Sequence, residues 1–147
     1  MRTNKHNKVQ KALERLLRSK NMNSETESKP VEINELLKPD IVVRTKEPIF
    51  VIDVNCPFDD SNSVEQARSK NHDKYRDVTR QIQDRTGIHT TVETFVVCSL
   101  GTWDKRNNDV LRRLSFRFPE YQRNKEEIIA KVIKDSRKTY ESHRGQF

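Results

Sequence analysis

Two β-branched runs on either side of a short polar segment constrain the fold of this chain more than any other feature. The runs are IVV at residues 41–43 and IFVIDV at 49–54, and the polar segment RTKEP joins them. Runs of this composition, separated by a few turn-forming residues, are typical of an antiparallel β-hairpin. We therefore expect a hairpin here, and the rest of the chain has to be arranged around it.

Helical and strand patterns surround this hairpin. The segments that we expect to be regular are a helix over 6–20, a helix from Ser61 or Ser63 as its cap to Arg85, a strand over 89–100, a short helix over 108–114 and a long amphipathic helix over 119–142. The polar stretch 21–30 is expected to be a loop, and VEINELL at 31–37 a short extended segment. This order predicts an α/β (α+β) domain, with a small mixed sheet and flanking helices.

Length and composition narrow the class of protein. The chain has 147 residues, which at about 100–200 residues per domain suits one domain. We expect a core over 1–103 and a C-terminal helical extension of the same domain over 104–147. No apolar run approaches the roughly 18 residues of a membrane span, and the N-terminus MRTNKHNK does not resemble a signal peptide. We expect neither a membrane partner nor secretion.

The charge balance and the cysteines indicate the setting of the protein. Lys and Arg total 29 against 22 Asp and Glu, a formal net charge of +7, which favours a polyanionic partner such as nucleic acid. Cys56 and Cys98 are far apart and lack the close doublets of a zinc site. Two isolated cysteines are typical of buried thiols in a reducing compartment, so we expect an intracellular or nuclear protein.

Asp40 and Asp53 are the residues of the hairpin that carry chemical information. Residues paired across an antiparallel hairpin have numbers that add to a constant. If the turn is centred between Lys46 and Glu47, Asp40 and Asp53 are partners. Their Cβ atoms would then lie roughly 4.5–5.5 Å apart on one face. Two facing carboxylates repel each other, and a hard divalent cation such as Mg²⁺ removes the conflict. The alternative is a pair of solvated aspartates offset by a bulge.

The helix after the hairpin directs further polar residues toward the sheet. Its apolar stripe comprises Val64, Ala67, Tyr75, Val78 and Ile82. At about 100° per residue, Asn71 lies at the centre of this stripe, Lys74 on its edge and Lys70 farther round the helix. A lysine that leans toward the two carboxylates could neutralise a phosphate. The alternative is a half-buried lysine whose ammonium group reaches solvent.

A basic cluster with interleaved aromatic residues follows in the C-terminal part of the chain. It consists of Arg112, Arg113, Arg117, Arg123 and Lys125, with Phe116, Phe118 and Tyr121 between them. Such a cluster suits contact with a nucleic-acid backbone. A solvated helix face explains the same residues nearly as well.

A series of short motifs extends this pattern over nearly the whole chain. They are KHN at 5–7, KPD at 38–40, VIDV at 51–54, PF at 57–58, Ala67, KY at 74–75, LGTWD at 100–104, and a tail with Arg112, Arg113 and residues 140–147. In this order and spacing they resemble the restriction-like endonuclease domain of non-LTR retrotransposon reverse transcriptase polyproteins. The fold of that domain belongs to the PD-(D/E)xK nuclease superfamily.

The resemblance implies an endonuclease that depends on Mg²⁺ or Mn²⁺ and nicks one DNA strand, so that the exposed 3′ hydroxyl primes reverse transcription. It assigns metal binding to Asp40 and Asp53. It also implies that Lys74 stabilises the developing charge on phosphate beside Tyr75, with Lys70 as a second candidate lysine. The partners would be DNA and the reverse transcriptase portion of the same polyprotein.

One departure from the family pattern leaves an alternative open. The family usually has a lysine three residues before the lysine of its KY motif, and here that position is Asn71. A domesticated, catalytically inactive module that keeps the nuclease fold and binds nucleic acid is therefore a second hypothesis. A junction- or repair-type nuclease with the same core is a third.

Overall fold

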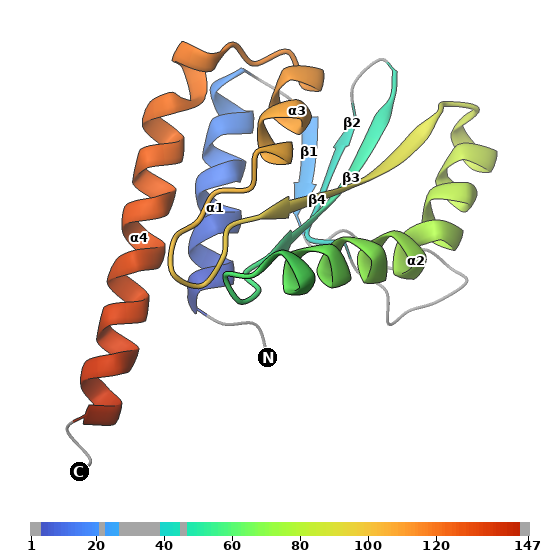
Figure 1. Cartoon of the computed structure of the whole chain (residues 1–147). Helices are drawn as coiled ribbons and strands as arrows, with labels where there is room; N and C mark the ends of the chain where they lie inside the picture. The colour runs from blue at the N-terminus through green and yellow to red at the C-terminus, as the bar shows by residue number, and fades with distance from the viewer. Residues whose placement is uncertain (1–3, 21–22, 27–38, 45–46, 145–147) are drawn as a thin grey trace.

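A four-stranded mixed sheet forms the centre of the protein (Figure 1). The computed structural model describes residues 4–20, 23–26, 39–44 and 47–144. The strands follow each other in space in chain order: β1 (Asn23–Thr26), β2 (Ile41–Arg44), β3 (Ile49–Asn55) and β4 (Thr90–Val96). The pairings are antiparallel except for β3 with β4, which are parallel and are joined through a helix. The predicted mixed sheet with α/β character is confirmed.

The register of the β2–β3 hairpin is the one that the sequence predicts. Ile41 pairs with Ile52 and Arg44 with Ile49, so the next pair at the open end of the hairpin is Asp40 with Asp53. Of the two expected turn residues, Lys46 lies outside the described residues. The hairpin prediction is therefore confirmed along its described ladder.

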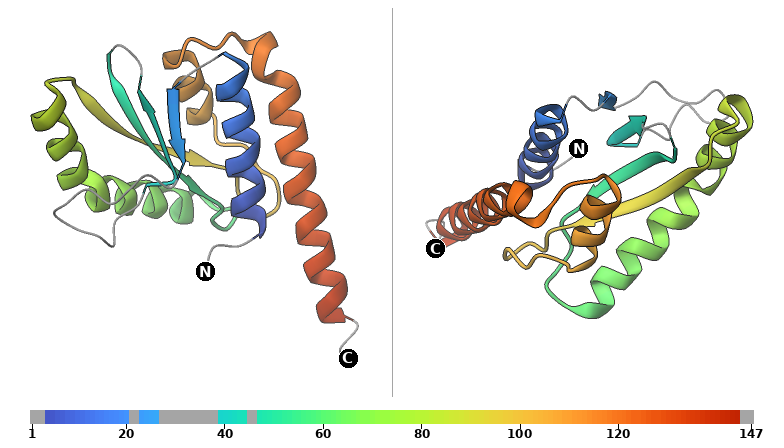
Figure 2. Two further views of the ribbon diagram at one scale, coloured as in Figure 1. Left: turned by 180° about the vertical axis from the view of Figure 1, so that it is seen from behind. Right: turned by 90° about the horizontal axis from the view of Figure 1, so that it is seen from above.

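Helices cover both faces of the sheet (Figure 2). One face carries α1 (Asn4–Ser19), with α4 (Phe118–Arg144) packed beside it, and the short α3 (Arg106–Arg113) lies near β4. The opposite face carries α2 (Ser61–Thr86). Alternate strand residues point to opposite faces, so each strand contributes to two apolar cores. Part of the first core comes from Leu13, Ile52, Phe95, Leu111 and Ile128, and part of the second from Val51, Tyr75 and Val78.

The first of these cores ties the C-terminal helices to the rest of the fold. Leu111 and Ile128, from the expected C-terminal extension, are buried in the same cluster as Leu13 and Phe95. Within the described residues, no helix is both long and apolar enough to span a bilayer.

Several expectations at the ends of elements are wrong. Residues 23–26, expected to be part of a loop, form β1, because backbone pairing with β2 needs no apolar side chains and NSET has none. The helix cap is Asp60, whose Oδ1 accepts the Ser63 N–H at 2.7 Å, and not one of the two serines. The extended segment expected at 31–37 lies outside the described residues.

Two further elements differ from expectation in length or packing. β4 ends at Val96 rather than near residue 100, because the Asn107 side chain takes both the N–H and the C=O of Val96, at 2.9 and 2.7 Å. In α4, which is expected to be amphipathic, the apolar residue Ile133 is 43% exposed. Ile133 lies beside Gly101, which has no side chain. A Cβ atom added to Gly101 would come within 2.7 Å of the Ile133 Cγ1.

Candidate active site

Asp40 and Asp53 lie together at the open end of the β2–β3 hairpin. Asp53 shares the sheet face of Val51, which is the face covered by α2, and Asp40 directly precedes β2 at the same end of the hairpin. Only 1% of Asp40 and 3% of Asp53 is exposed, and their side chains are joined by a hydrogen bond. Two buried carboxylates close to each other repel, so the doubly charged pair is costly to the fold. The expected cross-strand pair is therefore present.

The Asp40 carboxylate is held from two further directions. Its Oδ2 lies 2.9 Å from the His6 Nε2 of α1 and accepts the Val54 N–H at 2.8 Å. Its backbone carbonyl accepts a hydrogen bond from the Gln10 Nε2 at 3.3 Å. Burial raises the pKa of Asp40, but the hydrogen bonds to His6, Asp53 and Val54 outweigh burial and hold the pKa below the ordinary value of 3.8.

The Asp53 carboxylate receives donors from α2 and from its own strand. The Tyr75 hydroxyl donates to Oδ1 at 3.3 Å, and the Asn55 Nδ2 donates to Oδ2 at 3.2 Å. Tyr75 is fully buried, so its ring is fixed between the helix and the sheet. The structure thus brings three of the expected site residues, Asp40, Asp53 and Tyr75, into one hydrogen-bonded group.

The two expected lysines are placed differently. Lys74 is exposed, and its Nζ lies 5.1 Å from the centroid of the Tyr75 ring, so it reaches the site through that ring. Lys70 is also exposed, but within the described chain its side chain makes no hydrogen bond, ion pair or ring contact. The structure therefore places Lys74, but not Lys70, in contact with the group around Asp53.

Asn71 faces the sheet, as its helical position predicts. It is 6% exposed and lies one turn before Tyr75 on the same face of α2. Its Nδ2 has no hydrogen-bond partner among the described residues. A buried amide without a partner costs about 1–3 kcal/mol, so this unpaired donor lowers the stability of the fold.

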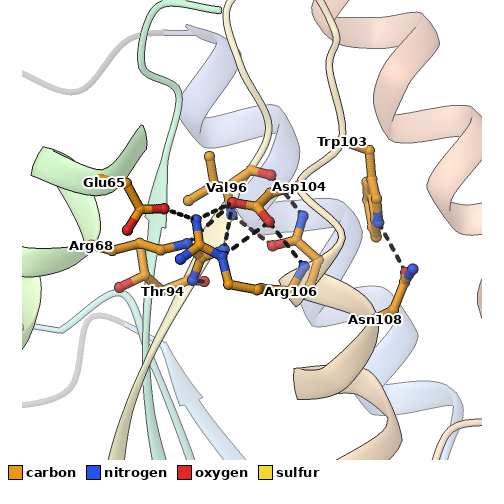
Figure 3. Close-up of polar contacts among 9 residues, drawn as sticks. Glu65, Arg68, Thr94, Val96, Trp103, Asp104, Arg106 and Asn108 are labelled. Atoms are coloured by element: carbon orange, nitrogen blue, oxygen red, sulfur yellow. Dashed lines mark hydrogen bonds and ion pairs between the residues drawn. The ribbon is translucent and has the colours of Figure 1, made fainter. Parts of the chain in front are cut away.

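Asp104, the last residue of the LGTWD segment, has a structural role (Figure 3). The Asp104 carboxylate accepts from the Arg68 guanidinium of α2 and from the Arg106 guanidinium of α3, and Arg106 also pairs with Glu65. The same Arg68 donates to the carbonyl of Thr94 in β4. These contacts join two helices to the edge strand.

Trp103 anchors the loop after β4. Its indole N–H donates to the Asn108 side chain at 3.0 Å, and its ring meets the Phe95 ring edge to face at 5.2 Å. The Lys125 Nζ lies over the Trp103 ring, 5.5 Å from its centroid.

Much of the basic cluster expected to bind nucleic acid is already engaged with protein groups. Arg112 pairs with Asp109 and Arg113 with Glu93, while Lys125 lies over Trp103. In the described chain, Arg117 and Arg123 are exposed and form no ion pair. Contact of the cluster with nucleic acid stays a prediction.

His6 and Gln10 are the residues of this site whose contacts sequence reasoning did not anticipate. Their partner Asp40 lies 34 and 30 residues away, and no local pattern relates a helix to a strand end at that distance. The only signal was the KHN motif at 5–7, which indicated a resemblance and no contact.

The donor set of this site fits a hard divalent cation. Mg²⁺ is held by one or two carboxylates, with water and substrate phosphate filling the other positions, and Asp40 and Asp53 supply two. A bound cation would offset the repulsion between the two carboxylates. In the described residues, no cluster of three or more ligating side chains is found. No protein-family model matches the chain, and no curated protein shows significant similarity to it.

Proposed function

We propose that this chain is a metal-dependent DNA endonuclease domain of the kind found in non-LTR retrotransposon polyproteins, with a PD-(D/E)xK core. The observation that carries the proposal is the pair Asp40 and Asp53, buried at one strand end and hydrogen bonded to each other. Folding alone gives no reason to bury two facing carboxyl groups. A cation-binding role does.

Each residue around the pair has a definite task in this proposal. Asp40 and Asp53 would hold the cation, which when bound polarises the phosphate and lowers the pKa of a water molecule. His6 and the Val54 N–H orient Asp40, and Tyr75 orients Asp53. Lys74, exposed beside Tyr75, can reach a phosphate oxygen and stabilise the charge that develops in the transition state.

The proposed reaction is hydrolysis of one phosphodiester bond in DNA. Water adds to phosphorus, the bond to the 3′ oxygen breaks, and that oxygen takes up a proton to leave a 3′ hydroxyl. In a retrotransposon polyprotein the reverse transcriptase portion would extend this hydroxyl. The intracellular and nuclear setting follows from such a role.

A nicking assay tests the proposal. Supercoiled plasmid is incubated with the protein and Mg²⁺ or Mn²⁺, and conversion to the open circle is followed by gel electrophoresis. We expect nicking that Asp53→Asn abolishes and that Asp77→Asn, an exposed aspartate of α2, leaves unchanged. Nicking that persists in Asp53→Asn would refute the site.

A second candidate function is a catalytically inactive module of the same fold that binds nucleic acid. The observation that favours it is Asn71, at the position where the family usually has a lysine. DNA binding that weakens with salt, with no nicking under any divalent cation, would favour this candidate over the first.

A further inference from the structure

The C-terminal half of α4 carries three basic side chains without a partner in the described part of the chain. Lys134, Arg137 and Lys138 are exposed, and within the described residues none of them forms an ion pair or a side-chain hydrogen bond. This distinguishes them from Arg112, Arg113 and Lys125, whose charged groups already have protein partners. Free cations on one helix face are available to an external anion.

The nearby acidic side chains that the structure describes do not cancel the charge of this face. Asp135 is buried and pairs with Lys8 of α1. One turn or more toward the start of α4, Glu127 pairs with both Arg15 and Lys131. The exposed surface from residue 134 to residue 138 therefore has a positive charge.

The contacts between α1 and α4 place these residues at the level of His6 along the helix pair, and His6 is the residue of α1 that contacts Asp40. The two helices run antiparallel: Arg15 of α1 contacts Glu127 of α4, and Lys8 contacts Asp135. Half a turn beyond Lys8, α1 reaches His6, which contacts Asp40. Half a turn beyond Asp135, α4 reaches Arg137. Lys134 and Lys138 lie one turn or less from that level.

The other basic cluster is at the opposite end of the helix pair. Lys20, at the far end of α1, contacts Glu120 near the start of α4. At about 1.5 Å per residue, the levels of His6 and Lys20 are separated by roughly 21 Å. In Figure 1 the C-terminal half of α4 extends past the N-terminal end of α1, at the end of the molecule where β3 leads into α2.

We propose that Lys134, Arg137 and Lys138, here called the α4 basic face, bind the phosphate backbone of duplex DNA beside the candidate active site. This inference rests on the proposed function, which makes DNA the substrate. The three cationic side chains contact phosphates and not base edges. The face therefore binds duplex DNA without reading its sequence. It holds the duplex so that a phosphodiester bond lies near Asp40 and Asp53.

Binding measurements with two matched triple variants test this inference. A fluorescently labelled 30-base-pair duplex is titrated in EDTA at several salt concentrations, so that no cleavage takes place. One variant is Lys134→Glu, Arg137→Glu and Lys138→Glu. The control is Arg112→Glu, Arg117→Glu and Arg123→Glu, with the same charge change in the basic cluster around the start of α4.

We expect the α4 variant to lose at least about 10-fold in affinity, and the slope of log K against log salt to fall by about 2–3, since each phosphate contact contributes about 0.9. The control variant should lose less. Replacement of the same three α4 residues by glutamine should reproduce the loss if it comes from missing contacts. Circular dichroism of each variant checks that α4 is folded.

The inference is overturned if the α4 variants bind duplex DNA as the wild type does, or if the control variant loses the larger share. It is also overturned if the wild-type chain does not bind duplex DNA. Salt-dependent binding that the α4 variants lose, without nicking in the plasmid assay, would refute the endonuclease and leave the α4 basic face standing.

Discussion

His6 and Asp40 are joined by a 2.9 Å contact between the Nε2 of His6 and the Oδ2 of Asp40, although they are 34 residues apart. Both side chains are buried, and the contact links the first turns of α1 to the start of β2. It fixes the direction of a carboxylate that we assign to cation binding. His6 is thus a positioning residue, since it acts through Asp40.

We expect His6→Ala to weaken both the fold and the site. The change leaves the Asp40 carboxylate with one donor fewer, which costs about 1–3 kcal/mol in the free energy of unfolding. Loss of an orienting partner also lowers metal affinity by about 10–100-fold. Urea denaturation and Mn²⁺ titration measure the two effects. The control His72→Ala, at an exposed site on α2, should change stability by less than about 0.5 kcal/mol.

Asn71→Lys tests whether the departure from the family pattern limits activity. The residue is buried, faces the sheet and has an Nδ2 without a partner in the described structure. A lysine there would bring a cation toward Asp53, so we expect faster nicking than in the wild type, by about 10-fold or more. Asn71→Met, of similar length and without charge, is the control. Equal rates in all three proteins would exclude a catalytic role for this position.

The ion pairs of Asp104 give the stability of the fold a defined pH dependence. Burial raises the pKa of Asp104, but hydrogen bonds from Arg106 and Arg68 outweigh burial and hold the pKa below 3.8. A carboxyl group whose pKa is lower in the folded than in the unfolded chain stabilises the fold at pH values above its unfolded pKa. This contribution disappears as the pH falls through the folded pKa.

The free energy of unfolding of the wild type should therefore exceed that of Asp104→Asn by a constant amount above about pH 5. The difference should shrink as the pH falls from about 5 toward and below 3.8, the pH at which half of Asp104 is protonated in the unfolded chain. Urea denaturation from pH 3 to pH 7 measures it. A difference that is independent of pH would show that the charge of Asp104 does not stabilise the fold.

The two cysteines should be unreactive in the folded protein. Burial raises the pKa of the Cys56 thiol to about 12, and burial also raises the pKa of Cys98. Thiolate is the reactive form, so we expect almost no reaction with a disulfide reagent such as DTNB at pH 8 in native buffer. In denaturant, Cys56 and Cys98 should both react. Rapid reaction of the native protein would contradict the packing around the end of β3.

The sequence predicts the part of the site that depends on local pattern. The β-branched runs and the polar turn determine the hairpin register, and this register brings Asp40 opposite Asp53. The apolar stripe of α2 in the same way predicts that Asn71 and Tyr75 face the sheet. Both inferences need only the strand and helix periods, which follow from backbone geometry.

Long-range contacts could not be predicted in this way. The bond from His6 to Asp40 depends on how α1 crosses the end of the sheet, which no periodicity encodes. β1 depends on backbone pairing with β2 and has no apolar residue to announce it. Likewise, whether a basic residue such as Arg113 is free for a ligand depends on its partner, Glu93, on another element.

Binding of Mn²⁺, measured by calorimetry in the absence of DNA, tests the shared carboxylate site most directly. We expect the wild type and Asp77→Asn to bind the ion with the same affinity, and both Asp40→Asn and Asp53→Asn to lose that binding. Asp40 and Asp53 are buried in contact with each other, so one ion must use both. Equal affinity in all four proteins, or loss in only one of the two site variants, would contradict the account.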